Sequence, residues 1–538
     1  MVVSPVPWKL LGDVSTWSQN WPWIPQPARV PVDVKASVCT LCPKGCGMRV
    51  RMAGGWPVGL AGSRIHPVSQ GALCPLGFGA HQLIWHPMRL RAVRHRGGNS
   101  SWDEARAAFA KACGEGPIGV VDGFPGRAAS SIFESFAQKR NGTYRAVLGA
   151  ETQALTPYEA WTRVPADLLG FDLENARTVV SFGAPLLESW GTPGRFSHLW
   201  AERAAGQADP RMRLIQVESS LSTTGARAWR RIAIRPGSET AFAAGIARVL
   251  LEDRLVSARG PMPPWTLAMS AGQTGISEDA IRECARTIVA ASPALAIARD
   301  DNPAVAALNI VLGAVGRRGG IVPRSKARKS VRAGAADLRS MRAVVIDGSV
   351  PWDFVPETDA EIFRFAAWDG GATRAQWLLP APAFLEEMTD VPTAPASAID
   401  TYAIAPALVQ APADARSAAQ FLRDSDPTLV PLDTIIHARC EALFRGRTGT
   451  LCAQESTPVA NLASVEKLEE QLRNGSVWMG EPQPVGELRC DLKAWPADRP
   501  ATPSLPSSSA WATAVLPPLA SKLYQESSLL QPLARRTE

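Results

Sequence analysis

The sequence lacks an apolar run of the roughly 18 residues that a membrane-spanning helix requires. The run Ala241–Leu251 is interrupted by Arg248. The segment Met1–Val14 has neither the basic start nor the apolar core of an export signal. These absences predict a soluble or peripheral protein.

The residue groupings of common hydrolases and nucleotide-binding enzymes are also missing. No Ser/His/Asp set, paired carboxylates or phosphate-binding loop stands out. The net charge is +7, but its basic clusters at 89–96 and 326–332 carry no nucleic-acid recognition motif. We therefore expect no nucleic-acid partner. With 538 residues, 46% of them hydrophobic, the chain is long enough for about two to four compact domains.

Cysteine is scarce and unevenly placed. The chain has 9 cysteines, of which four lie within 39–74 and the others are scattered as Cys113, Cys284, Cys440, Cys452 and Cys490. A disulfide framework would space an even number of cysteines through a smaller chain. The cluster therefore indicates a metal site, and the scattered five are interpreted as buried thiols.

The four clustered residues follow the pattern Cys39-x2-Cys42-x3-Cys46-x27-Cys74. Four thiolates complete the ligand set of a cubane [4Fe–4S] cluster. The first three stand on a Gly-containing turn, C-T-L-C-P-K-G-C-G, which lets sulfurs converge and directs backbone N–H groups at them. Zinc usually takes two C-x2-C pairs and is the less favoured alternative, followed by unliganded thiols. We predict one [4Fe–4S] cluster on Cys39, Cys42, Cys46 and Cys74, and no catalytic residue.

After this motif, helices and strands alternate as in open parallel sheets. Helices are expected at 102–113, with Ser101 as the cap, and at 128–139, 238–251 and 302–315. Strands are expected at 116–122, 178–182, 214–217, 232–235, 294–298, 343–347 and 377–379. The alternation is typical of doubly wound α/β domains. From about residue 395 the pattern fades.

The chain accordingly divides into five parts. They are an extended Trp/Pro-rich arm (1–34), an iron–sulfur domain (35–95), a discontinuous α/β domain (96–155 and 290–440), a Rossmann-like domain inserted in it (156–289) and an irregular C-terminal extension (441–538). The arm docks either on its own body, which we favour, or on a partner subunit.

Several segments resemble the molybdopterin oxidoreductases, the complex iron–sulfur molybdoenzymes. Beside the cysteine motif they are H-P-V-S-Q-G-A-L-C-P-L-G (66–77), H-P-M-R-L (86–90), S-W-D-E-A (101–105), V-V-S-F-G-A-P-L-L-E-S-W (179–190), I-R-P-G-S-E-T-A (234–241), L-N-I-V-L-G-A-V-G-R-R-G-G-I (308–321) and W-L-L-P-A-P-A-F-L-E (377–386). The resemblance covers roughly residues 36–390. It implies a small iron–sulfur domain followed by two Rossmann-like α/β domains.

The chain departs from the active members of that family. They carry a Lys or Arg between cluster and pterin, where this chain has Leu76. They also carry a Cys, selenocysteine, Ser or Asp metal ligand early in the second domain, and the nearest residue here is Thr156, which is not a usual ligand. Their closing β-barrel cannot be traced after Glu386, so we expect it to be reduced or absent. The Gly-rich turn at 313–320 leaves residual pterin binding open.

With these losses the chain resembles one branch of the family. The branch consists of the molybdopterin-binding-like subunits of membrane quinone reductases, such as menaquinone reductase and alternative complex III. P-V-P-W-K-L-L (5–11), W-S-Q-N-W-P-W-I-P (17–25) and S-K-L-Y-Q-E-S (521–527) fit the same branch. Its subunits are thought to lack molybdenum. The resemblance implies an electron-transfer and scaffold subunit of a quinone oxidoreductase complex, not catalytic by itself.

The same resemblance implies iron–sulfur, multihaem cytochrome and integral membrane subunits as partners, through which the chain contacts the membrane. Homologues begin with a twin-arginine export signal, and Met1 aligns where that signal would end. We therefore expect the periplasmic face of a membrane, with the cytoplasmic face as the alternative. The alternative function is a molybdopterin-dependent oxidoreductase acting on a small substrate, with molybdopterin guanine dinucleotide as its cofactor.

Overall fold

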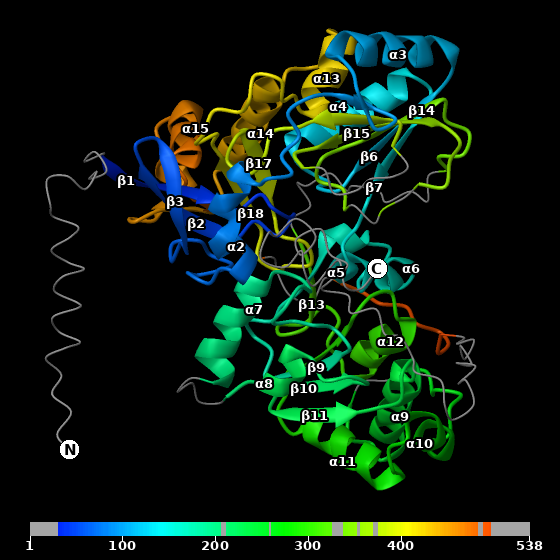
Figure 1. The fold of residues 1–538 in the computed structure, drawn as a ribbon. Helices are drawn as coiled ribbons and strands as arrows, with labels where there is room; N and C mark the ends of the chain where they lie inside the picture. The colour runs from blue at the N-terminus through cyan, green and yellow to red at the C-terminus, as the bar shows by residue number, and fades with distance from the viewer. Residues whose placement is uncertain are drawn as a thin grey trace, which may run out of the picture.

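The computed structural model describes residues 31–205, 211–257, 260–324, 337–351, 354, 356–368, 375–482 and 488–496. Over these ranges the protein is mixed α/β, with two large lobes and a small N-terminal sheet beside them (Figure 1). Most of the predicted Trp/Pro-rich arm and the segment 497–538 lie outside the described residues. Within the described part of the chain, no helix has the length and apolarity needed to cross a bilayer.

The N-terminal sheet has three antiparallel strands, β1 (Val32–Val38), β2 (Gly47–Ala53) and β3 (Trp56–Gly62), followed by α2 (Pro75–Gly79) and the 3-10 helix η1 (Ala80–Trp85). Strand β2 buries Met48, Val50 and Met52 on one face and exposes the side chains between them on the other. Residues 32–34, which we expected in the extended arm, belong to β1 instead, because they pair with 51–53 of β2.

The first lobe contains a sheet of order β5-β4-β16-β15-β14-β6-β7. Its parallel strands are β6 (Ile118–Asp122), β7 (Thr143–Ala146), β14 (Ala343–Ile346), β15 (Glu361–Ala366) and β16 (Trp377–Pro380), and β4 (Arg94–His95) and β5 (Gly98–Asn99) add an antiparallel edge. Helices α3 (Trp102–Glu115), α4 (Ala128–Lys139) and α13 (Ala418–Ser425) belong to this lobe. The predicted cap is confirmed, because Ser101 and Glu104 form a capping box.

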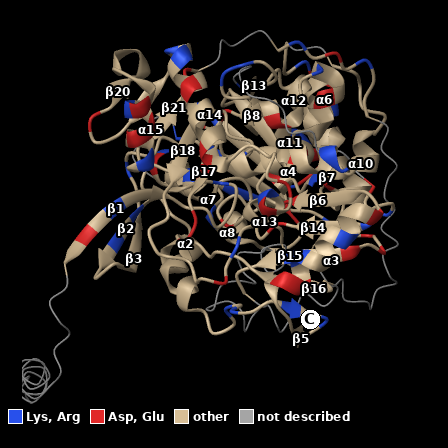
Figure 2. Ribbon diagram, turned by 90° about the horizontal axis from the view of Figure 1, so that it is seen from above, with Lys and Arg blue, Asp and Glu red and all other residues tan. Residues whose placement is uncertain are grey.

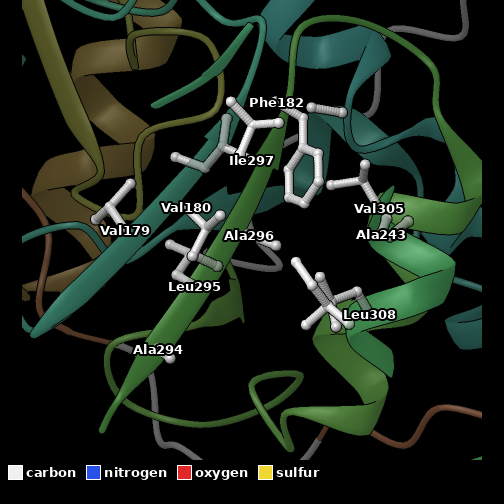
Figure 3. Close-up of a cluster of buried hydrophobic side chains, with 14 of the residues drawn as sticks. Val179, Val180, Phe182, Ala243, Ala294, Leu295, Ala296, Ile297, Val305 and Leu308 are labelled. Carbon is white, nitrogen blue, oxygen red and sulfur yellow. The ribbon is translucent and has the colours of Figure 1, made fainter. Parts of the chain in front are cut away.

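The second lobe contains a four-stranded parallel sheet of order β11-β10-β9-β12. Its strands are β9 (Thr178–Phe182), β10 (Arg213–Glu218), β11 (Arg230–Ala233) and β12 (Ala294–Ala298), and its main helices are α9 (Glu239–Glu252), α10 (Leu267–Thr274), α11 (Glu278–Val289) and α12 (Pro303–Val311). Side chains of β9 and β12 pack on those of α9 and α12 (Figure 3). The strand at 294–298, which we expected in the discontinuous domain, pairs with β9 instead, because the chain returns after α11 beside the sheet that it left.

Shorter elements connect the lobes or join strands of the second lobe. They are α5 (Ala150–Gln153), α6 (Thr156–Thr162), α7 (Pro193–Leu199), α8 (Thr223–Arg227), the 3-10 helix η2 (Ala166–Leu168), the π-helical turn η3 (Trp200–Ala204) and the antiparallel pair β8 (Leu169–Phe171) and β13 (Ile321–Pro323). In Figure 1, α7 lies close to α2 of the N-terminal region, so the second lobe approaches the cysteine-rich segment there.

The C-terminal part forms an antiparallel sheet of order β17-β18-β21-β19-β20. The strands are β17 (Thr389–Pro392), β18 (Thr401–Ala405), β19 (Thr450–Cys452), β20 (Thr457–Pro458) and β21 (Val477–Met479), joined by α14 (Leu432–Gly446), the 3-10 helix η4 (Val459–Asn461) and α15 (Val465–Arg473). The expected irregular extension is therefore wrong for 441–479, because Cys440, Leu468 and Leu472 share a buried core with this sheet. Among the described residues the sheet stays open and does not close into a barrel.

Candidate metal centre

Three of the four clustered cysteines stand on the loop of the β1–β2 hairpin. The hairpin closes through the pair Val38 and Gly47, and the N–H of Cys39 donates to the carbonyl of Cys46 at 2.8 Å. Within the loop, Gly45 has a φ of +59°, and a Cβ there would lie 2.5 Å from a methyl carbon of Val391. Gly45 thus permits both the left-handed turn and the close packing against β17.

The fourth cysteine is the N-cap of α2. The Cys74 sulfur accepts the N–H of Gly77 at 3.3 Å, as an N-cap side chain does. This position brings Cys74 to the hairpin loop, and all four cysteines line one cavity of about 50 Å³. The structure therefore brings together the four residues that the sequence predicted as ligands.

Each of the four sulfurs has a backbone N–H partner. Besides Gly77, the donors are Leu41 to Cys39, Lys44 to Cys42 and Gly194 to Cys46. Hydrogen bonds from backbone N–H groups to ligand sulfurs are a main means by which proteins hold and tune iron–sulfur clusters. The donor set fits a cluster of four thiolates.

Burial controls the protonation of Cys39, Cys42 and Cys46. Burial raises the pKa of Cys39 well above its usual value, and the neighbouring Cys42, Cys74 and Cys46 raise it further. Burial raises the pKa of Cys42 to about 11, although the charge of Lys44 lowers it. The pKa of Cys46 is also raised by burial. Because the thiolate is the ligand form, a metal must displace these protons, and its binding energy is then coupled to folding.

Across the described ranges, no three His, Cys, Asp or Glu side chains are grouped closely enough to hold one metal ion together. Four thiolates around one zinc ion, at about 2.3 Å each, would lie within about 4 Å of one another. A cubane does not need such a group, because each of its four irons takes a single thiolate.

The second lobe completes the cavity. Pro193, at the start of α7, lines it together with Glu188 and Ser189. The buried Lys44 donates from its Nζ to the carbonyl of Ser189, and this hydrogen bond ties the cysteine loop to the lobe. Sequence reasoning missed Gly194, although a Cβ there would lie 3.1 Å from the Cys46 sulfur and 2.9 Å from the carbonyl oxygen of Ala72.

A larger cavity of about 480 Å³ adjoins the cysteine loop and is lined by both lobes. Cys42, Lys44 and Ser189 line both cavities. Its other walls come from segments that follow strands of the first lobe, from the second lobe and from β17, and they include Phe124, Glu151, Trp190, Arg299, Ser349 and Pro392. This position, at the carboxyl ends of parallel strands, is where open α/β sheets bind ligands.

The residues compared with the metal and pterin site of active relatives lie at different places relative to the two cavities. Leu76 lines the small cavity as an apolar side chain, and the cation next to the sulfurs is Lys44. Thr156, the expected nearest counterpart of the metal ligand, begins α6 and is not among the residues that line either cavity. Glu151 lines the large cavity, is 4% exposed and has no hydrogen bond or ion pair to its carboxylate within the described residues. Sequence reasoning missed Glu151.

The Gly-rich turn at 313–320 connects α12 to β13. The Gly316 N–H donates to the carbonyl of Ile321, and the Gly320 N–H donates to that of Arg317. The Gly319 N–H donates to Asp172 Oδ2 at 2.7 Å. These donors are used within the turn or by its neighbours Ile321 and Asp172, as expected for a structural connection between helix and strand.

Comparison with known proteins gives a family for the cysteine-rich segment. Residues 32–86 match the model of the molybdopterin oxidoreductase Fe4S4 domain. The chain is also 31% identical, over 62% of its own length and 52% of the relative, to the menaquinone reductase molybdopterin-binding-like subunit of Nitratidesulfovibrio vulgaris.

Two further curated relatives are more distant. The nitrate-inducible formate dehydrogenase major subunit of Escherichia coli is 25% identical over 41% of this chain, and the nitrate reductase of Klebsiella oxytoca is 24% identical over 48%. The chain spans 52%, 25% and 32% of the three relatives, respectively. The predicted resemblance to molybdopterin oxidoreductases is confirmed.

Among solved structures, acetylene hydratase from Pelobacter acetylenicus has the same overall fold. The TM-score is 0.59 at 13% identity, over 83% of this chain and 74% of the hydratase. The match shows that the chain shares the fold of this structure over most of its length.

Proposed function

We propose that this chain, which carries a molybdopterin oxidoreductase Fe4S4 domain, is the iron–sulfur electron-transfer and scaffold subunit of a membrane-bound quinone oxidoreductase complex. The observation that supports it most is the convergence of Cys39, Cys42, Cys46 and Cys74 on one cavity, each with a backbone N–H at its sulfur. We propose these four as the ligands of one [4Fe–4S] cluster. A bound cubane would supply one-electron transfer.

We further propose that the chain works without molybdenum. Leu76 stands where active relatives have a cation between cluster and pterin. The carboxyl ends of β6 and β14, where a doubly wound sheet would bind a dinucleotide, carry Asp122 and Asp347, and both form ion pairs with Arg127. Carboxylates there disfavour phosphate groups, and the guanidinium is already committed.

The name of one relative supports the quinone link. The menaquinone reductase relative is a molybdopterin-binding-like subunit, so we infer a multisubunit complex for this chain as well. Iron–sulfur, multihaem cytochrome and integral membrane subunits are the proposed partners. The proposed location is a membrane surface, on the periplasmic face, reached through those partners.

One observation favours a second candidate function, a catalytically active molybdopterin-dependent oxidoreductase. Glu151 offers a buried carboxylate, without a hydrogen-bond or ion-pair partner among the residues that the structure describes, to the large cavity next to the cysteine loop. Carboxylate is one of the ligand types that active relatives use. Under this alternative, Glu151 would ligate a metal in the cavity, and the purified chain would contain about one molybdenum or tungsten.

The experiment is isolation of the tagged full chain from membranes in mild detergent. We expect a complex that contains membrane and redox subunits, in which quinol reduces the cluster, as followed by electron paramagnetic resonance. Isolation of the chain alone, with activity on a small substrate, would contradict the proposal. A variant lacking residues 2–30 tests the arm: we expect it to lose partners more than iron.

A further inference from the structure

The exposed apolar side chains are concentrated in the N-terminal region. Of the large apolar residues that stand exposed among the described residues, seven lie between 32 and 88, and the remaining five are spread over the rest of the chain. The seven are Val32, Val34, Trp56, Val58, Phe78, Trp85 and Met88. Such a concentration is uncommon on a chain that works alone and marks an interaction surface.

Five of these residues form the surface that we call the tryptophan face: Trp56, Val58, Phe78, Trp85 and Met88. Their residues are between 39% and 53% exposed. Trp56 and Val58 lie on β3, an edge strand, and β3 packs against both α2, which carries Phe78, and η1, which ends at Trp85. The two indole rings are 5.7 Å apart. Trp56 and Trp85 therefore lie side by side, next to the helix that carries Phe78.

Positive charge borders this face. Arg51 of β2 pairs with Val34 of β1 and with Gly59 of β3. Ala53 is two residues from Arg51, so both point to the same face, and Ala53 pairs with Trp56. Arg51 and Trp56 therefore share the outer face of the sheet. Arg49 lies on the same face, two residues from Arg51 on β2. Neither arginine forms an ion pair with any residue that the structure describes. Figure 2 shows the three strands projecting from one side of the molecule with Lys and Arg along them.

The tryptophan face lies next to the proposed cluster. Cys74 caps α2, and the N–H of Phe78 donates to the Cys74 carbonyl at 3.1 Å, so Phe78 stands one helical turn from the ligand. Pro75, directly after Cys74, is also exposed. An electron leaving by this route crosses about one helical turn of protein before it reaches the surface.

From these observations we infer that the tryptophan face is the docking surface for an electron-transfer protein that presents an apolar centre rimmed by carboxylates. Two paired indoles supply the rigid apolar anchors that dominate protein interfaces, and Arg49 and Arg51 select an acidic rim. The inference rests on the proposed function, because it places the electron partner against α2. The arginines favour an acidic protein that exchanges electrons, so we commit to that occupant.

The test compares two variants in the intact complex. In the double variant Trp56→Asp and Trp85→Asp, the amount of redox partner retained should fall by about tenfold or more. The iron content per chain should stay unchanged. Trp229→Asp is the matched control, because Trp229 is 55% exposed on the second lobe, and it should retain the partner as the wild type does. Normal partner retention by the double variant would overturn the inference.

A gentler variant covers the case in which the double variant loses iron through misfolding. Arg51→Glu changes only an exposed charge and should weaken partner retention several-fold, more at low salt than at high salt. Arg254→Glu, also exposed but on the second lobe, should have no effect. Equal retention by Arg51→Glu and Arg254→Glu at low salt would overturn the acidic-rim inference.

Two further measurements identify the occupant. A photo-crosslinker, Trp85→p-benzoylphenylalanine, should link to the redox subunit; an internal link to residues 1–30 would overturn the inference in favour of the chain's own arm. Vesicles of phosphatidylcholine and phosphatidylglycerol should not bind the chain through this face. If the wild type binds such vesicles, and Trp56→Asp abolishes vesicle binding but retains the partner, the inference is overturned in favour of lipid as the occupant. If the wild type carries no redox partner, the proposed function itself fails.

Discussion

The two cavities beside the cysteine loop share Leu41, Cys42, Lys44 and Ser189 but differ in how complete their sets of ligand groups are. In the small cavity of about 50 Å³, four sulfurs converge and each has a backbone N–H donor. In the large cavity of about 480 Å³, the walls are mainly apolar, and the buried Glu151 carboxylate has no partner among the described residues. The small cavity has the four sulfurs that a cubane cluster would need, whereas the large cavity has room for a ligand but no comparable set of ligand groups among its described lining residues.

This difference is the basis of the proposal that the chain transfers electrons and does not use molybdenum. Burial raises the pKa values of Cys39, Cys42 and Cys46, so bringing these thiols together is costly unless a metal binds them. Apart from the buried carboxylate of Glu151 and the shared thiol of Cys42, the large cavity contains, among the residues that the structure describes, no group whose burial costs free energy in the absence of a ligand. The fold can therefore keep this cavity without a ligand in it. The proposed electron-transfer role rests on the first site alone.

The largest expected effect comes from breaking the small cavity. Cys46→Ser should abolish the cluster, so that iron falls from about four per chain to near zero and the brown absorption disappears. The same change should destabilise the segment 39–74, because cluster binding is also folding energy. Cys113→Ala, at a half-buried thiol in α3 and outside both cavities, is the control and should keep its iron. Retention of iron by Cys46→Ser would refute the ligand assignment.

The contribution of the second lobe can be tested at Gly194. In Gly194→Ala the new methyl group would meet the Ala72 carbonyl at 2.9 Å and the Cys46 sulfur at 3.1 Å. We expect a several-fold loss of cluster content, measured as iron per chain, because the N–H donor must move away. Gly114→Ala places its methyl group in open space and should leave iron unchanged. Equal iron in both variants would show that the second lobe does not support the cluster.

A smaller effect is expected from pH. Burial lowers the pKa of His66 to about 4, and its Nδ1 accepts the N–H groups of Val68 and Ser69, so the fold requires the neutral ring. The unfolded chain binds the proton near pH 6.5, so stability from this group is present above that pH and is lost as pH falls towards 4. Between pH 7 and 5 the loss should be about 2 kcal/mol.

Urea unfolding of wild type and His66→Asn at both pH values measures that loss. Asn retains an acceptor but cannot take up the proton, so the variant should show the smaller decrease between pH 7 and 5. A decrease of the same size in both proteins would remove His66 as the cause.

The smallest expected effect concerns the cation shared by the two cavities. Lys44→Ala removes a buried positive charge beside Cys42 and Cys46, so the reduced cluster loses stabilisation and its potential should fall by on the order of 50 mV. Lys44→Arg keeps the charge and should shift the potential less. A redox titration followed by electron paramagnetic resonance measures both, and an unchanged potential in Lys44→Ala would assign Lys44 to packing alone.

The sequence predicted what is encoded locally. The capping box of Ser101 and Glu104, the buried run of β9 and the spacing of the four cysteines each lie within a short segment, and the structure has them where expected. The N–H of Gly194 at Cys46 could not be predicted, because it depends on how the second lobe packs against the hairpin loop. Glu151 has no motif around it, and only the cavity reveals it.

Two errors have the same origin. Strand β12 was placed in the wrong sheet, because the sequence of a buried strand does not state which neighbour it pairs with. The C-terminal sheet was missed, because β19, β20 and β21 are only two or three residues long and too short to show alternation. Both depend on contacts between residues far apart in the chain.

The most direct test of the account is the metal content of the complex purified anaerobically from its native membrane. Iron, zinc, molybdenum and tungsten are measured together and divided by the amount of this chain, with iron from separable partner subunits subtracted. The account predicts about four iron atoms per chain and far less than one molybdenum or tungsten. One equivalent of molybdenum or tungsten with a released pterin, or stoichiometric zinc in place of iron, would contradict it.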